Sequence, residues 1–318
     1  MPFRRLQDGS LPRQEHRPRL LRLLRSEGPR RAVRARPSIT AERGSVKLPV
    51  LEAAYLERPA QPNVSAYCLG SFKLVLDGAE LSCWKSGKAR QLFQYLLLHR
   101  NRPMPRETLM EALWPNPEAA APSTSLKVAV HALRQTLGQA SPTDLGLETS
   151  EAGYALVAPN LWLDVEEFQR LTAQAHALER QDNQTAALAA YESAVNLYQG
   201  QFIADSYDDW VLLRRESLKD QYLFSVARLA DAAFDRHDYH GCLFYCQRLL
   251  EHDPCREDAY RRMMLCHARL GQPTRVRSWY ELCVRTLRSE LEVDPEPETK
   301  WLFERALRGE FAIQLAVS

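Results

Sequence analysis

The spacing of apolar residues changes several times along the chain, and these changes restrict the fold more than any other feature of the sequence. Between Tyr67 and Cys83 the apolar residues follow a strand-like pattern, which the hairpin-type turn Asp77-Gly78 interrupts. Helical spacings and a second hairpin pattern follow, and from Leu163 onward almost every segment has a helical period. The sequence therefore predicts a mainly α protein with small β-sheets.

Three helices are expected after the first hairpin pattern. Apolar residues recur at helical spacings over residues 87–100, 106–114 and 123–137. Ser86 is the expected cap of the first helix, and Ser123 or Thr124 is the expected cap of the third. Gly138 is expected to end the third helix.

A second hairpin is expected directly after the third helix. Its strands are Leu145–Thr149 and Tyr154–Ala158, joined by a turn over residues 150–153. The order of sheet, three helices and hairpin is the architecture of a winged helix-turn-helix domain. In such a domain a helix enters the DNA major groove, and the hairpin can contact the neighbouring minor groove or backbone. Residues 63–160 are therefore predicted to form a DNA-binding domain.

The segment from residue 161 to residue 310 is predicted to be entirely helical. Its expected helices cover residues 164–180, 184–198, 208–236, 239–252, 256–270, 274–290 and 296–308. Asp238 and Gln272, at two of the breaks between helices, are 34 residues apart, which is the period of a tetratricopeptide repeat. An all-α, tetratricopeptide-like repeat domain is therefore expected.

Charge is distributed unevenly along the chain. Residues 1–62 are rich in Arg and Pro, carry a net charge of +8 and are expected to be a disordered basic tail. The net charge is +1 for residues 63–160 and −7 for residues 161–318, the last eight of which are expected to be a C-terminal tail. This asymmetry favours nucleic acid as a partner of one end of the chain only.

Several other classes of protein are not expected. No segment is long and apolar enough to span a membrane, and the basic start lacks a signal-peptide core, so a cytoplasmic, nucleoid-associated location without membrane contact is expected. Sequence patterns of hydrolases, P-loop proteins and dinucleotide-binding enzymes are missing, so neither an enzyme nor a cofactor is expected. His237, His240, Cys242 and Cys246 lie close in sequence, but the two cysteines fall on an apolar helical stripe. Buried thiols with surface histidines are therefore expected there rather than a metal site.

Short segments of both halves resemble a known family of regulators. Residues 69–72, 88–98, 109–115, 133–138 and 153–156 resemble the OmpR-type winged helix of the Streptomyces antibiotic regulatory proteins. Residues 163–168, 187–198, 260–264 and 282–295 resemble the bacterial transcriptional activator domain of the same family. The resemblance covers about residues 66–308.

The resemblance implies a sequence-specific activator. Such a protein would bind direct repeats near promoters as two protomers side by side, a homodimer on double-stranded DNA, and would help to recruit RNA polymerase. The helical domain would contribute to dimerisation. A second interpretation remains open: a tetratricopeptide-like scaffold whose degenerate winged helix binds protein, which salt-sensitive DNA binding would exclude.

Candidate DNA contacts follow from the expected helices and hairpin. The exposed N-terminal half of the third helix would reach base edges through Ser123, Thr124, Lys127 and His131. Phosphates would be contacted by Lys85, Lys88, Arg90, Arg106 and Arg134, of which the first four lie near helix N-termini. Thr149 and Ser150 would lie on the wing.

Overall fold

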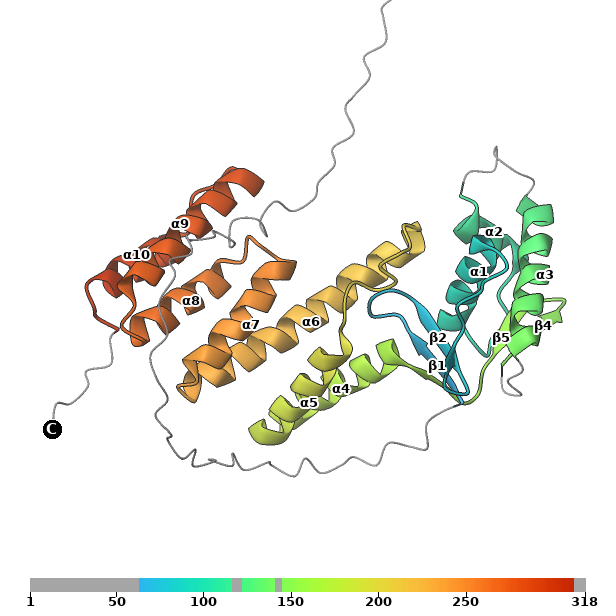
Figure 1. The fold of residues 1–318 in the computed structure, drawn as a ribbon, viewed down its shortest axis with the longest axis horizontal. Coiled ribbons are helices and arrows are strands. Elements are labelled where there is room, and N and C mark those ends of the chain that lie inside the picture. Colours follow the sequence, from blue (N-terminus) through green and yellow to red (C-terminus); the bar gives the residue numbers. More distant parts are fainter. Residues whose placement is uncertain (1–62, 116–121, 141–144, 312–318) are drawn as a thin grey trace, which may run out of the picture. The chain divides into compact units, whose positions relative to one another are not determined.

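The computed structural model describes residues 63–115, 122–140 and 145–311 (Figure 1). Of the two expected tails, residues 1–62 and residues 312–318 lie outside these described ranges. In the described part of the chain, no helix is long and apolar enough to cross a membrane. The fold is mainly α with small β-sheets, as the sequence predicts.

A four-stranded sheet opens the first domain. Strands β1 (Val64–Tyr67), β2 (Lys73–Leu76) and β3 (Ala79–Glu80) are antiparallel neighbours, and β6 (Leu161–Leu163) pairs in parallel with β1. Asp77 and Gly78 connect β2 to β3 with φ angles of 48° and 83°. Both angles lie in the left-handed region, which is the geometry that an Asp-Gly hairpin turn requires. The predicted first hairpin is thereby confirmed.

Three helices follow the hairpin. Helix α1 (Gly87–Leu98) is capped by Ser86, whose hydroxyl accepts a hydrogen bond from the Ala89 amide at 3.0 Å, so the predicted cap is confirmed. Helix α2 (Arg106–Leu113) matches its predicted range. Leucines at helical spacing on all three helices are buried, and they form the centre of this domain: Leu92, Leu96, Leu109, Leu113, Leu126 and Leu133.

The third helix differs from its prediction at both ends. Helix α3 (Pro122–Ala140) starts at Pro122, so Ser123 and Thr124 lie in its first turn and not at the cap position. Proline is well suited to the first turn because the amide that it lacks has no partner within the helix. The helix also continues through Gly138, where packing of the buried Leu137 outweighs the low helix propensity of glycine. The two errors leave the predicted exposed face of the helix unchanged.

The wing is a two-stranded hairpin of β4 (Gly146–Ser150) and β5 (Gly153–Val157). Tyr154 of β5 exchanges two backbone hydrogen bonds, of 2.8 and 3.0 Å, with Met104 just before α2. Gly153 has a φ of 132°, which brings the wing backbone against that of Met104. The wing is therefore fixed directly to the start of α2.

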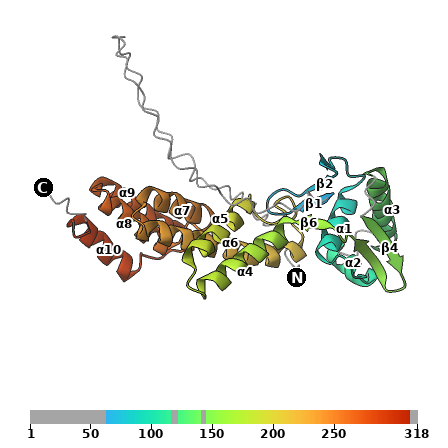
Figure 2. The ribbon, with the colours of Figure 1, turned by 90° about the horizontal axis from the view of Figure 1, so that it is seen from below.

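The rest of the described chain is helical. Its helices are α4 (Asp164–Glu179), α5 (Gln184–Leu197), α6 (Asp209–Asp235), α7 (Tyr239–His252), α8 (Glu257–Arg269), α9 (Pro273–Glu290) and α10 (Pro297–Leu307). Each helix packs against the next one in the chain (Figures 1 and 2), as in helical repeat proteins. Every predicted helix of this half is present.

Segments of the helical half also complete the first domain. The carboxylate of Asp164, the first residue of α4, accepts hydrogen bonds from the backbone amides of Cys68 and Leu69 at 2.8 Å. Residues 201–204 form three backbone hydrogen bonds, of 2.7 to 3.1 Å, with residues 68–70. The buried guanidinium of Arg215 on α6 donates to backbone carbonyls within residues 202–206. The end of β1 is therefore held by residues 164 and 201–204, which lie far along the chain from it.

Candidate nucleic-acid interface

Helix α3 presents a polar face to solvent. Ser123, Thr124, Lys127 and His131 are all exposed, as expected from the apolar spacing of the opposite face. On that opposite face Leu126, Val130 and Leu133 are buried in the core. The structure therefore brings the four predicted base-contact residues together on one solvent-facing helix surface.

The wing is joined to this helix through a side-chain contact. Arg134 of α3 donates a hydrogen bond of 2.6 Å to the hydroxyl of Thr149 on β4, and both side chains are exposed. On the same helix, Nε2 of Gln135 lies 3.0 Å from Nε2 of His131. We call the exposed face of α3 and the adjoining wing residues Thr149 and Ser150 the α3–wing surface. Its polar residues on α3 are Ser123, Thr124, Lys127, His131, Arg134 and Gln135.

Besides Arg134, which is bonded to Thr149, two more of the predicted phosphate-contact residues are engaged in contacts within the protein. The Lys88 ammonium donates to the backbone carbonyl of Leu113 at 2.6 Å, at the C-terminal end of α2. Arg90 donates to the Phe72 carbonyl at 2.9 Å and forms an ion pair of 2.6 Å with Asp205. Either residue can contact a phosphate only by sharing or releasing these partners.

The other two helix-terminal cations are available to solvent. Lys85 and Arg106 are exposed, and the Arg106 guanidinium lies 5.6 Å from the centre of the Tyr154 ring on the wing. This contact positions a positive charge beside the hairpin. Lys85 and Arg106 are therefore better placed to contact the DNA backbone than Lys88 and Arg90, whose side chains already have partners within the protein.

One residue of the α3–wing surface is missing from the sequence-based set. Val128 is 62% exposed, although valine is apolar, and it lies next to Lys127 on α3. The signal was present in the sequence, since Val128 falls outside the buried series Leu126, Val130 and Leu133.

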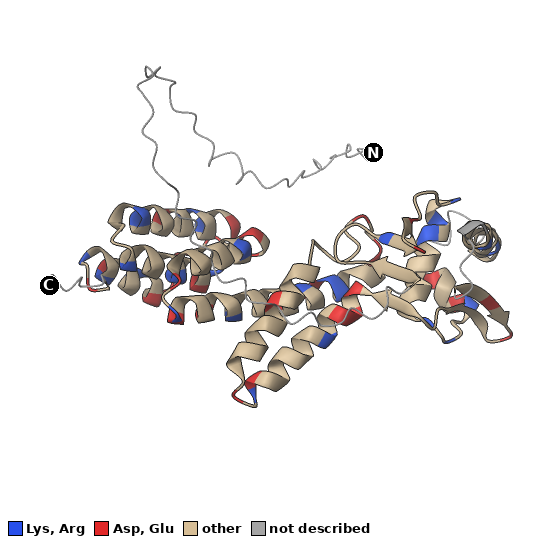
Figure 3. Cartoon of the chain, turned by 60° about the horizontal axis from the view of Figure 1, so that its bottom comes forward, with Lys and Arg blue, Asp and Glu red and all other residues tan. Residues whose placement is uncertain are grey.

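The helical half has a different electrostatic character. Residues 161–318 carry a net charge of −7, and Figure 3 shows Asp and Glu interspersed with Lys and Arg along these helices. Negative charge repels the phosphate backbone of DNA. The net charge of this half is therefore unfavourable for a second DNA-binding face.

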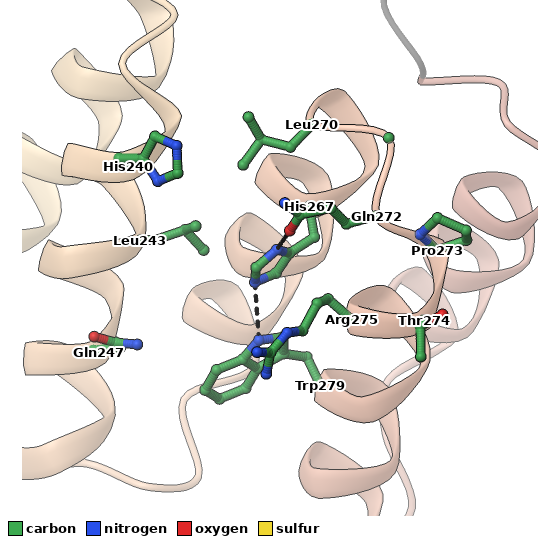
Figure 4. Close-up of a pocket in the computed structure, with 11 residues that line it drawn as sticks. His240, Leu243, Gln247, His267, Leu270, Gln272, Pro273, Thr274, Arg275 and Trp279 are labelled. Carbon is green, nitrogen blue, oxygen red and sulfur yellow. Dashed lines mark hydrogen bonds between the residues drawn. The ribbon is translucent and has the colours of Figure 1, made fainter. Parts of the chain in front are cut away.

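A cavity of about 590 Å³ lies between α7, α8 and α9 (Figure 4). Beside it, the Trp279 indole donates to Nε2 of His267 at 3.0 Å, and Nδ1 of His267 donates to the Gln272 amide oxygen at 2.8 Å. Burial lowers the pKa of His267, which agrees with a neutral ring that accepts one hydrogen bond and donates the other. His267 is therefore a polar cross-link between α8 and the start of α9.

The residues that suggested a metal site are separated by the fold. His240 is exposed and lines the cavity, whereas Cys242 and Cys246 are buried on the core side of α7. Among the residues that the structure describes, no group of three potential ligands could hold a metal ion. The buried position of both thiols matches the expectation from the apolar stripe.

Comparisons with known proteins assign a family model to each half. Residues 82–156 match the model described as transcriptional regulatory protein, C terminal, and residues 163–307 match the bacterial transcriptional activator domain. The first match includes all three helices and the wing up to Leu156, and the second includes α4 to α10.

Named regulators are similar to both halves together. The chain is 25% identical to the regulatory protein AfsR of Streptomyces griseus over 73% of its own length, and 24% identical to the transcriptional regulatory protein MoaR1 of Mycobacterium tuberculosis over 79%. These alignments cover 23% of AfsR and 86% of MoaR1, so the chain spans less than a quarter of the former.

A solved structure of M. tuberculosis EmbR, in complex with a low-affinity phosphopeptide, has a similar fold. It superposes with a TM-score of 0.60 over 77% of this chain and 65% of that chain, at 20% sequence identity. MoaR1 and EmbR are named as transcriptional regulatory proteins, and AfsR is named as a regulatory protein. The chain thus combines an OmpR-like DNA-binding domain with a bacterial transcriptional activator domain, and it is homologous to regulators of the Streptomyces antibiotic regulatory protein type.

Proposed function

We propose that this protein is a sequence-specific transcriptional activator that binds direct-repeat DNA near promoters. The observation that carries the proposal is the α3–wing surface, where exposed polar side chains of α3 adjoin the hairpin through Arg134 and Thr149. An exposed polar helix beside a hairpin matches the major-groove docking of winged-helix proteins. The proposed function places the protein in the cytoplasm, at the nucleoid.

The residues of this surface divide into two roles. Lys127 and His131 would address acceptor groups on base edges, with Ser123 and Thr124 as more permissive neighbours. Lys85 and Arg106 would contact phosphates directly, while Lys88, Arg90 and Arg134 would first have to share or exchange their internal partners. In this arrangement the phosphate contacts fix the register of α3, and the base contacts select the sequence.

The helical half is proposed to meet protein partners. Its net charge of −7 disfavours DNA, and stacked helical hairpins present extended surfaces suited to protein recognition. We assign to it the recruitment of RNA polymerase and contacts with a second copy of the chain on adjacent repeats. Both assignments rest on the similarity to known regulators.

The proposal is tested by selecting binding sites for the full chain from a pool of random DNA duplexes. Fluorescence anisotropy then measures the affinity of the selected and of scrambled DNA at several salt concentrations. The Lys127→Ala and His131→Ala variants should each lose about 5- to 150-fold affinity for the selected site, which corresponds to 1–3 kcal/mol for a good base contact. Affinity for scrambled DNA should change much less.

The matched control is Arg170→Ala, which removes an exposed cation of α4 that pairs with Glu167, far along the chain from α3. It should leave both affinities unchanged. If no sequence is enriched and DNA binding is insensitive to salt, the proposed function is wrong. The scaffold interpretation, in which the winged helix binds protein, would then replace it.

A further inference from the structure

An exposed valine lies among the proposed base-contact residues of α3. Val128 is 62% exposed, and it is the only apolar side chain with such exposure on the described part of α3. Thr124 lies four residues before it and His131 three residues after it, so these three side chains share one helix face. Lys127 is its direct neighbour on the polar surface.

The fold does not require valine at this position. The core side of α3 is filled by Leu126, Val130 and Leu133, and Val128 points away from them into solvent. A β-branched residue is a poor choice for an exposed helix position, because its side chain loses rotational freedom there. Single exposed apolar residues are common on protein surfaces. The exposure of Val128 points to a function because its neighbours on the helix are the proposed base-contact residues.

The DNA major groove offers one apolar group, which is the 5-methyl of thymine. An apolar side chain among the proposed base-contact residues of α3 is suited to contact that group. We propose that Val128 reads the methyl of a thymine in the binding site, beside the base that Lys127 contacts. This inference rests on the proposed DNA-binding function and names a specificity residue of that same surface.

The test uses the DNA site selected by the full chain. Each thymine in the site is replaced, one at a time, by deoxyuridine, which removes the methyl and leaves base pairing and charge unchanged. At one position the replacement should weaken binding by wild-type protein about 3- to 5-fold, the effect expected for one buried methyl group. The Val128→Ala variant should lose a similar factor on the thymine site and should be much less sensitive than the wild type to deoxyuridine at that position.

Lys127→Ala is the matched control, because it removes a neighbouring contact and leaves Val128 in place. It should bind more weakly overall and keep its sensitivity to deoxyuridine. The inference is overturned if no thymine methyl contributes to binding, or if Val128→Ala keeps the wild-type sensitivity. If Lys127→Ala lowers the affinity for the selected site and Val128→Ala does not, only the methyl contact is refuted. If no DNA site can be selected, the proposed function is refuted as well.

Discussion

Replacing Gly153 with alanine tests whether the wing is packed on the start of α2 as closely as the structure shows. A Cβ atom on Gly153 would lie 1.8 Å from the Met104 carbonyl oxygen and 2.6 Å from the Met104 carbonyl carbon. Both are backbone atoms, so no side-chain rotation can relieve the clash. The φ of 132° at Gly153 is, in addition, a conformation that residues with a Cβ rarely adopt.

The expected cost can be worked out from these contacts. The unfavourable backbone conformation costs about 1–3 kcal/mol. Relieving the clash separates Met104 from Tyr154 and breaks their two backbone hydrogen bonds, each worth roughly 1 kcal/mol. The sum is about 3–5 kcal/mol, which is a large share of the total stability of roughly 5–15 kcal/mol that is typical of a protein domain.

Gly78→Ala is the matched control. Gly78 also has a positive φ, of 83°, but a Cβ there would meet nothing within 4 Å. Its replacement should therefore cost only the conformational energy, about 1–2 kcal/mol. The difference between the two variants isolates the contact between the wing and Met104.

Urea denaturation followed by tryptophan fluorescence measures both variants, since Trp84 and Trp114 pack against the core of the first domain. Gly153→Ala should unfold at a clearly lower urea concentration than Gly78→Ala. Because the wing would be displaced, it should also bind the selected DNA site more weakly. Equal unfolding midpoints for the two variants would refute the close packing of the wing.

Two further predictions concern the segments that hold the end of β1. Burial raises the pKa of Asp164 to about 6, whereas it is roughly 3.9 in an unfolded chain. Between these pH values the folded protein binds more protons than the unfolded chain does. The free energy of unfolding should therefore fall by about 3 kcal/mol as pH rises from about 3.9 to about 6. Asp164→Asn should remove this slope from urea midpoints measured between pH 4 and pH 6.5, and an unchanged slope would contradict the assignment. Arg215→Met should destabilise the protein by roughly 3 kcal/mol, because it removes the donor to the buried carbonyls of Phe202, Ile203 and Ser206, whereas Arg215→Lys should retain part of that stability. Equal urea midpoints for Arg215→Met and the wild type would show that these hydrogen bonds are dispensable.

The sequence by itself determined the local elements and the exposed face of α3. Helix periods, the cap Ser86 and the turn Asp77-Gly78 are encoded by residues close to each other in the chain, so local physical chemistry is sufficient to predict them. The same holds for the exposure of Lys127 and His131, which follows from the apolar residues of the opposite face. The exposure of Val128 follows from the same pattern, because Val128 falls outside the buried series of Leu126, Val130 and Leu133.

Only the tertiary structure decided which residues hold the first domain together and which cations are available. The pairing of β6 with β1, the hydrogen bonds of Asp164 and the ion pair between Arg90 and Asp205 join residues about 100 positions apart. No local pattern specifies such partners, because they depend on how the two halves of the described chain pack. For that reason Arg90, which the sequence suggests as a phosphate contact, is already paired with a carboxylate of the helical half.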